Sequence, residues 1–137
     1  MSSRAFILGG VALALGLSGC SLTASSTNNS GFTGQQALIA TTLNTLASDS
    51  SSANGADICT NVLASTLRAR LNKVGKCATI IDNQLKTVDD FKLTIKTILV
   101  NGSAATARVQ SVHNGKQIIQ TVSLKHESAG WRVVSAA

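Results

Sequence analysis

The spacing of the apolar residues changes near residue 91, and this change constrains the fold more than any other feature of the sequence. Between residues 32 and 85, apolar side chains recur every three or four positions, as they do along one face of a helix. From Phe91 onward they alternate with polar residues, because Phe91, Leu93 and Ile95 are separated by lysine and threonine. That alternation is the spacing of a strand. Helices followed by a run of strands predict an α+β domain, with the helices packed on an antiparallel meander of four strands.

Three helices are expected before that change. The first runs from 32 to about 47 with Thr33 as its N-cap, and the composition of residues 49–55 predicts a loop after it. The second runs from about 56 to 74 and ends at Gly75, and the third runs from 77 to about 85. Their expected buried residues are Leu38, Ile39, Leu43 and Leu46 in the first helix, Ile58, Val62, Leu63, Leu67, Leu71 and Val74 in the second, and Ile80, Ile81 and Leu85 in the third.

Turn signals divide the rest of the chain into four strands. The Asn-Gly pair at 101–102 is the strongest hairpin signal, and a second Asn-Gly pair follows at 114–115. Ile98 and Val100 fall out of the alternation that precedes them, so we expect a β-bulge or a twist near Thr97. The later strands are expected at 104–112, 117–126 and 131–135.

The first twenty residues have the organisation of an export signal. A short region with Arg4 precedes thirteen mostly apolar residues, 5–17, and small residues follow. Thirteen residues are too few to cross a hydrocarbon core of ~30 Å as a helix, so no transmembrane helix is predicted there. An ordinary secretory signal, cut near Ala14 or Gly19, is one interpretation of this segment.

The sequence Leu17-Ser18-Gly19-Cys20 resembles the bacterial lipobox, which favours a lipoprotein signal instead. The resemblance implies a thioether between diacylglycerol and Cys20, cleavage after Gly19, and often acylation of the new terminus; two or three acyl chains anchor a protein stably. We therefore expect a signal peptide at 1–19, the lipidated cysteine with a flexible polar tether at 20–31, and a single domain at 32–137. Such a protein is held on the extracytoplasmic side of the cell membrane or of an outer membrane.

The other two cysteines are Cys59 and Cys77, near the starts of the second and third expected helices. With Cys20 lipidated, an even number remains, as is usual in an exported domain. We predict a Cys59–Cys77 disulfide, whose loop of about 19 residues is worth roughly 3 kcal/mol in the chain-entropy model. A metal site and a catalytic thiol are weaker interpretations, because no histidine or acidic residue is grouped with these cysteines.

The net charge of +6 is spread along the chain. One local group contains Arg68, Arg70, Lys73 and Lys76, no aromatic residues lie among these cations, and the chain has no tyrosine. Single-stranded nucleic acid needs aromatic stacking platforms beside a basic groove, so no nucleic-acid partner is predicted. A solvated face explains these charges, and attraction to anionic lipid headgroups is the functional alternative.

The closing segment Gly130-Trp131-Arg132-Val133-Val134, together with the hairpin pair at 105–109 and 119–124, resembles small exported members of the nuclear transport factor 2-like superfamily. The resemblance covers about 34–135. It implies a cone, in which a strongly bent sheet wraps over helices and often encloses a pocket. Such sheets often form dimers through their exposed face, for which the candidate residues here are Thr94, Lys96, Arg108, Gln110 and Thr121.

Enzymes of that superfamily use an aspartate, sometimes with a histidine or tyrosine, inside the cone. The candidate pocket residues in this chain are His126, Asp89, Asp90 and Trp131. His126 shares the alternation of the inward-facing residues, yet a histidine there is more often structural than catalytic. Asp89 and Asp90 precede a strand, where aspartate commonly makes turn hydrogen bonds. His113 lies in an expected turn.

The sequence has no nucleophile elbow, phosphate-binding glycine loop or metal-ligand cluster. It therefore predicts no catalytic residue, no metal and no cofactor. Three functions remain: a noncatalytic membrane-tethered domain that binds a small apolar ligand or an envelope protein, a sheet-face interaction or dimerisation module without a pocket, and a small isomerase or hydrolase. A pocket lined by aliphatic residues favours the first, a filled cone the second, and a converging histidine or aspartate the third.

Overall fold

A computed structural model describes residues 31–87, 91–113 and 115–137. The expected signal peptide, Cys20, the tether, Asp89, Asp90 and Asn114 lie outside these residues. The elements follow the order that the sequence predicts, helices first and strands second. They are α1 (Gly34–Ser51), α2 (Gly55–Asp57), the π-helix η1 (Ile58–Val62), α3 (Ser65–Val74), α4 (Cys77–Leu85), β1 (Phe91–Asn101), β2 (Ala104–His113), β3 (Lys116–Glu127) and β4 (Gly130–Ala136).

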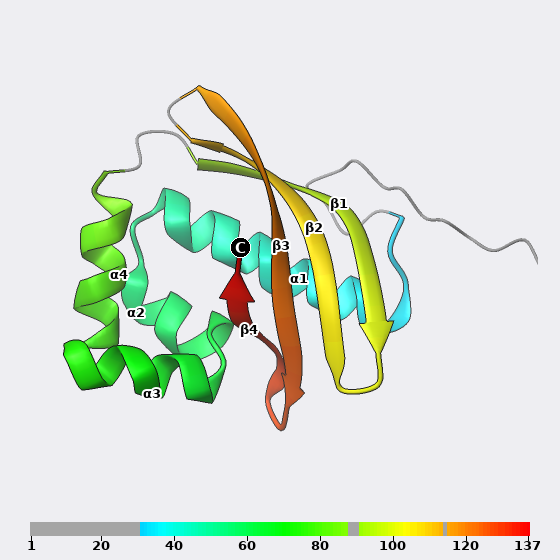
Figure 1. The fold of residues 1–137 in the computed structure, drawn as a ribbon, viewed down its shortest axis with the longest axis horizontal. Coiled ribbons are helices and arrows are strands. Elements are labelled where there is room, and N and C mark those ends of the chain that lie inside the picture. Colours follow the sequence, from blue (N-terminus) through cyan, green and yellow to red (C-terminus); the bar gives the residue numbers. More distant parts are fainter. Residues whose placement is uncertain (1–30, 88–90, 114) are drawn as a thin grey trace, which may run out of the picture.

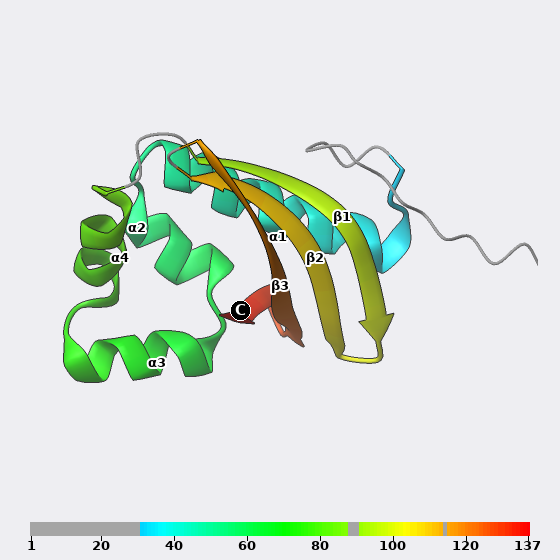
Figure 2. The same ribbon diagram turned by 45° about the horizontal axis from the view of Figure 1, so that its top comes forward.

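The four strands form one antiparallel sheet in the order β1-β2-β3-β4, as the meander requires. Figures 1 and 2 show the long strands bent over α1, while α2, α3 and α4 gather at one side of the sheet. Helices therefore cover one face of the sheet, and the buried core lies between them. No helix that the structure describes is both long and apolar enough to cross a membrane.

The inner face of the sheet follows from the two-residue period of the strands. Its buried residues are Leu93, Ile95, Ile98, Ala105, Ala107, Val109, Val122, Leu124, Trp131 and Val133. The register of β1 on β2 shifts between Ile95 and Thr97, so Lys96 is an extra residue. This confirms the expected bulge, which returns Ile98 to the inner face.

The first hairpin turn lies one residue later than the Asn-Gly signal suggests. Asn101 pairs with Ala104, so Gly102 and Ser103 occupy the loop. Only Gly102 of these two has a positive φ, of 60°. Glycine at the first central position is what a type II′ hairpin turn requires.

The expected second helix is wrong, because the chain is extended at Leu63 and Ala64 between η1 and α3. The cause is a tertiary contact. Leu63 forms a parallel bridge with Val133, and the Ala64 N–H donates to the Val133 carbonyl at 2.8 Å. These residues hydrogen-bond to the edge of β4 instead of continuing a helix. As a result Val74, which was expected to be buried, is 82% exposed.

The first helix is longer than expected and includes residues that were assigned to a loop. It continues to Ser51, where the Ser51 hydroxyl donates to the Ala47 carbonyl at 3.0 Å. Serine can bond to its own helix in this way. Thr33 takes the N-cap position without a side-chain cap hydrogen bond, and Leu38, expected in the core, is exposed.

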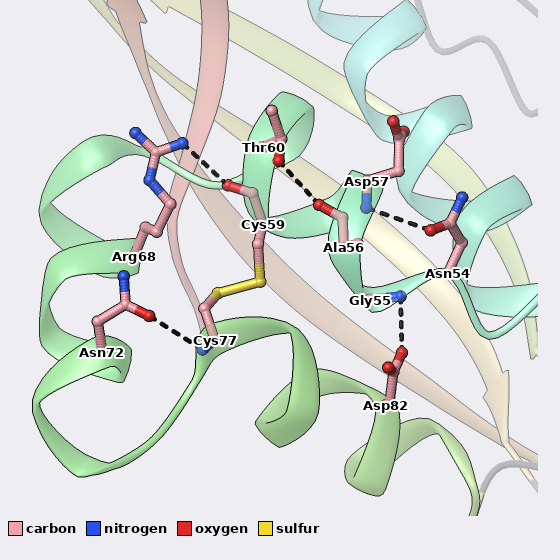
Figure 3. Close-up of a disulfide and its surroundings, with 10 residues drawn as sticks. All are labelled: Asn54, Gly55, Ala56, Asp57, Cys59, Thr60, Arg68, Asn72, Cys77 and Asp82. Carbon is pink, nitrogen blue, oxygen red and sulfur yellow. Dashed lines mark hydrogen bonds between the residues drawn. A yellow bond between two sulfur atoms is a disulfide. The ribbon is translucent and has the colours of Figure 1, made fainter.

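Cys59 and Cys77 form the predicted disulfide, which joins η1 to the start of α4 (Figure 3). Hydrogen bonds fix both of its ends. The Cys77 N–H donates to Asn72 Oδ1 at 3.0 Å, and Arg68 Nη1 donates to the Cys59 carbonyl at 3.3 Å. A further link joins α2 to α4, because the Gly55 N–H donates to Asp82 Oδ1 at 2.7 Å.

Candidate functional site

A cavity of about 240 Å³ lies inside the cone, between the helices and the inner face of the sheet. The helical side of its wall is formed by Leu46, Ser50, Ile58, Leu63, Ile81, Gln84 and Leu85. The sheet side is formed by Leu93, Val109, Ser111, Gln120, Val122 and Ala136. Most of these side chains are aliphatic, so the cavity favours an apolar occupant.

Two serines in this wall are largely buried. Ser111 on β2 is 5% exposed and Ser50 on α1 is 8% exposed. Both line the cavity, whereas the hydroxyls of Ser51 and Ser52, at the end of α1, donate to carbonyls of their own helix. Ser50 and Ser111 are therefore positioned to bond to a molecule inside the cavity.

The mouth of the cavity is marked by its more exposed wall residues. Gln84 near the end of α4 and Ala136 near the end of β4 are exposed, while Gln120 on β3 is half-buried. Gln120 pairs with Val109 across the inner face, so its amide lies between the apolar interior and solvent. A ligand with an apolar body and a polar end matches this gradient.

The wall of the cavity contains no titratable side chain among the residues that the structure describes. In the same part of the chain, no three histidine, cysteine or acidic side chains gather as they would around a metal ion. The cavity therefore presents the means to bind a molecule but no acid, base or nucleophile that is activated by a neighbour.

Of the candidate pocket residues, His126 and Trp131 lie outside this cavity. They pair across β3 and β4, and their rings meet edge to face with centroids 5.1 Å apart. Together with Gln35, Gly102 and Ser103 they line a separate hollow at the hairpin end of the sheet. The Trp131 ring is buried and the imidazole of His126 is exposed, so this pair helps to close the core.

An acidic pair, Asp49 and Asp57, lies near the end of α1. Burial, a hydrogen bond with Asp57 and the charge of Asp57 raise the pKa of Asp49 from its usual 3.8 to about 6. Asp49 Oδ2 is buried without a hydrogen-bond partner. Asp57 has a further partner, because Asn61 Nδ2 donates to Asp57 Oδ1 at 2.6 Å.

The polar residues of the cavity were missed by the sequence analysis, although the pattern contains a signal for two of them. Ser111 has the same parity as Val109, and Gln120 has the same parity as Val122. A polar residue on an inward-facing strand position indicates a cavity or a polar partner. No signal marks Ser50, because it falls in a segment that resembles a loop.

Comparisons with known proteins identify the fold. A crystal structure of a nuclear transport factor 2-like protein of unknown function from Shewanella baltica OS155 is similar, with 19% identity and a TM-score of 0.53. The match covers 72% of this chain and 87% of that one. At this identity the likeness shows the fold alone. The chain has an α+β nuclear transport factor 2-like cone.

Two other solved structures are similar to a lesser degree. A variant of a protein designated Rd1NTF2_05 is 13% identical, covers 70% of this chain and 91% of its own, and has a TM-score of 0.49. A de novo designed protein with a curved β-sheet is 12% identical, covers 44% and 57%, and has a TM-score of 0.37. No family model and no curated protein matches the sequence.

Proposed function

We propose that this chain is a lipid-anchored extracytoplasmic protein whose noncatalytic domain binds a small apolar ligand inside the cone. The observation that carries the proposal is the aliphatic cavity of about 240 Å³ with Ser111 in its wall. A filled cone would favour a pocketless interaction module, and a converging histidine or aspartate would favour an enzyme. Neither feature is found in the described part of this cavity.

The size of the cavity limits the ligand. An apolar cavity of about 150 Å³ holds benzene, while drug-sized ligands need 300 Å³ or more. The ligand is therefore a compact molecule, or one short alkyl chain, with a hydroxyl or carbonyl group that meets Ser111 or Gln120.

Ligand binding is tested first on material from the native envelope. The mature protein is purified without detergent exchange, and native mass spectrometry records any bound small molecule. 1-Octanol then serves as a defined probe, with heat of binding as the readout. We expect saturable binding by the wild-type chain and a loss of at least tenfold in Gln120→Trp, because the indole would fill the mouth.

Gln110→Trp is the matched control, since Gln110 lies on β2 and pairs with Ile119 on the outer face of the sheet. This variant should bind 1-octanol as the wild type does. Equal binding by both variants, or none by the wild type with no co-purified molecule, would contradict a ligand-binding cone.

The anchoring part of the proposal rests on the lipobox Leu17-Ser18-Gly19-Cys20. Cys20→Ala should abolish lipid attachment and stop normal cleavage. It should also change the share of the protein that is recovered with the membrane. Metabolic labelling with a palmitate analogue measures the attachment directly. A Cys20→Ala protein that is still cleaved normally and retained in the membrane would show that the anchor lies elsewhere.

A further inference from the structure

The outer face of the sheet carries a groove that no described element covers. Leu99, Thr106, Ser123 and Lys125 point away from the helices, and with Val134 and neighbouring hairpin residues they enclose about 670 Å³. Leu99 is 71% exposed although it is a large apolar residue. An exposed apolar patch rimmed by polar residues indicates a surface that contacts something else.

Most of the charge around this groove is positive. Arg108 lies next to Thr106 along the outer face, and Lys125 pairs with Arg132 across β3 and β4. Glu127 is the acidic residue nearest to them, and its carboxylate accepts hydrogen bonds from both the N–H and the hydroxyl of Ser65. These bonds, together with the charges of Lys125 and Arg132, lower the pKa of Glu127. The other described acidic residues lie in α1, α2 and α4. Arg108, Lys125 and Arg132 therefore outnumber Glu127, and the face has a net positive charge around an apolar centre.

The N-terminal end of the domain lies at the same end of the sheet as the groove. Gln36 Nε2 donates to the Ile98 carbonyl at 3.0 Å, and Gln35 lines a hollow with Gly102 and Ser103 of the β1–β2 hairpin. Figure 1 shows the first turn of α1 beside the ends of β1 and β2. A flexible linker of about eleven residues has an average reach of roughly 15–20 Å, which would keep this end near a lipid on Cys20.

We propose that the hairpin end of the outer sheet face docks on the anionic headgroup surface of the membrane, with Leu99 inserted and Arg108, Lys125 and Arg132 on the phosphates. The orientation rests on the proposed anchoring at Cys20. A positive face with an apolar centre matches an anionic surface that has an apolar layer beneath it. A second copy of the chain fits less well, because two such faces would bring like charges together.

The binding itself is tested without the lipid. Every buried apolar residue that the structure describes lies between Phe32 and Val133, so the chain from Ser21 onward contains the whole core. Sedimentation with vesicles measures its partition onto phosphatidylcholine alone and onto phosphatidylcholine with 30% phosphatidylglycerol. We expect binding to the anionic vesicles only, and weaker binding in 0.5 M salt.

Variants separate this face from general basicity. Each cation removed near an anionic surface should weaken partition roughly fivefold, so Arg108→Gln with Lys125→Gln should lose about 25-fold, and Leu99→Ser about tenfold. The matched control is Arg70→Gln with Lys73→Gln on the exposed surface of α3, which should change partition less than twofold. Equal losses from both charge pairs would overturn the proposed surface.

The orientation is tested on the full lipidated protein in its own envelope. Leu99→Cys and Val74→Cys place single thiols at two exposed apolar positions, and a membrane-impermeant maleimide measures their accessibility. We expect Val74→Cys to react at least fivefold faster. Equal reaction rates in lipidated protein would overturn the docked orientation. A Leu99-dependent dimer in sedimentation equilibrium without vesicle binding would assign this face to a second copy. Because the vesicle experiment omits Cys20, its result is independent of whether the anchor exists.

Discussion

The indole Nε1 of Trp131 donates a hydrogen bond of 2.7 Å to Oε1 of Gln35, and this contact joins the start of β4 to the first turn of α1. A second bond joins the same two elements, because Thr42 Oγ1 of α1 donates to the Trp131 carbonyl at 3.2 Å. Trp131 is buried. The closing strand is therefore held to the helix that fills the cone by both its side chain and its backbone.

Replacement of Gln35 by alanine should lower the free energy of unfolding by about 1–2 kcal/mol, because the buried indole N–H loses its acceptor. Urea unfolding, followed by the fluorescence of the single tryptophan, measures the change. Gln35→Glu is the matched control, since a carboxylate oxygen can accept the same bond, and it should stay within about 0.5 kcal/mol of the wild type. If Gln35→Ala leaves the free energy of unfolding unchanged, another group accepts the hydrogen bond of the indole N–H.

Replacement of Gly55 by alanine should destabilise the domain by about 1–3 kcal/mol, because the methyl group has no space. A Cβ at this position would overlap Asp82 Oδ1 and lie 2.6 Å from the Ala78 carbonyl oxygen. The same change would disturb the Gly55 N–H bond to Asp82. Thermal unfolding by circular dichroism measures the loss.

Gly75→Ala is the control for that prediction. The backbone of Gly75 is extended, with φ 172°, and a Cβ there would meet only the flexible side chain of Ile80, at 3.3 Å. We expect a change of less than about 0.5 kcal/mol. Similar losses at both glycines would show that the overlap with Asp82 and the Ala78 carbonyl is not the cause.

Removal of the disulfide by Cys59→Ser with Cys77→Ser should cost about 3 kcal/mol, because the unfolded chain regains the freedom of a loop between residues 18 apart in sequence. Equilibrium unfolding measures the change. The reduced wild-type protein should be as unstable as the double variant within about 1 kcal/mol. Equal stability of the oxidised and reduced proteins would contradict this role.

The sheet could be predicted closely from the sequence because its signals are local. A two-residue period, a bulge that shifts the period, and turn glycines give the bounds of all four strands to within about two residues. The break in the helix at Leu63 and Ala64 could not be predicted from the sequence, since alanine is the strongest helix former and no glycine or proline marks the site. Its cause is the carbonyl of Val133, far along the chain.

The candidate site was less predictable than the sheet. The cavity depends on how the helices sit against the sheet, and that distance is set by packing across the whole core. The titratable residue expected to face the interior, His126, instead meets Trp131 at the hairpin end. The inward position of Ser111 is visible in the alternation, but its place beside Ser50 in one cavity wall appears only once α1 and β2 are placed together.

Because of Asp49, the free energy of unfolding should decrease as the pH rises from about 4 to about 6. Its pKa is raised from 3.8 to about 6 in the folded protein, so the folded state holds a proton that the unfolded state loses at lower pH. Ionisation at neutral pH then costs stability, which is regained on acidification. Asp49→Asn should gain about 1 kcal/mol at pH 7.5, a value reduced for solvent screening, and nothing at pH 3.5.

The pH dependence of stability that Glu127 contributes has the opposite sign, and this residue serves as the comparison. The Ser65 N–H that donates to its carboxylate lowers the pKa of Glu127 below its usual value. Its contribution is therefore present at neutral pH and is lost as the pH falls through the folded pKa. Urea unfolding of both variants from pH 3.5 to 7.5 should show Asp49→Asn above the wild type and Glu127→Gln below it at neutral pH, with the three curves converging in acid. If Asp49→Asn is no more stable than the wild type at pH 7.5, the buried Oδ2 of Asp49 is not a source of instability.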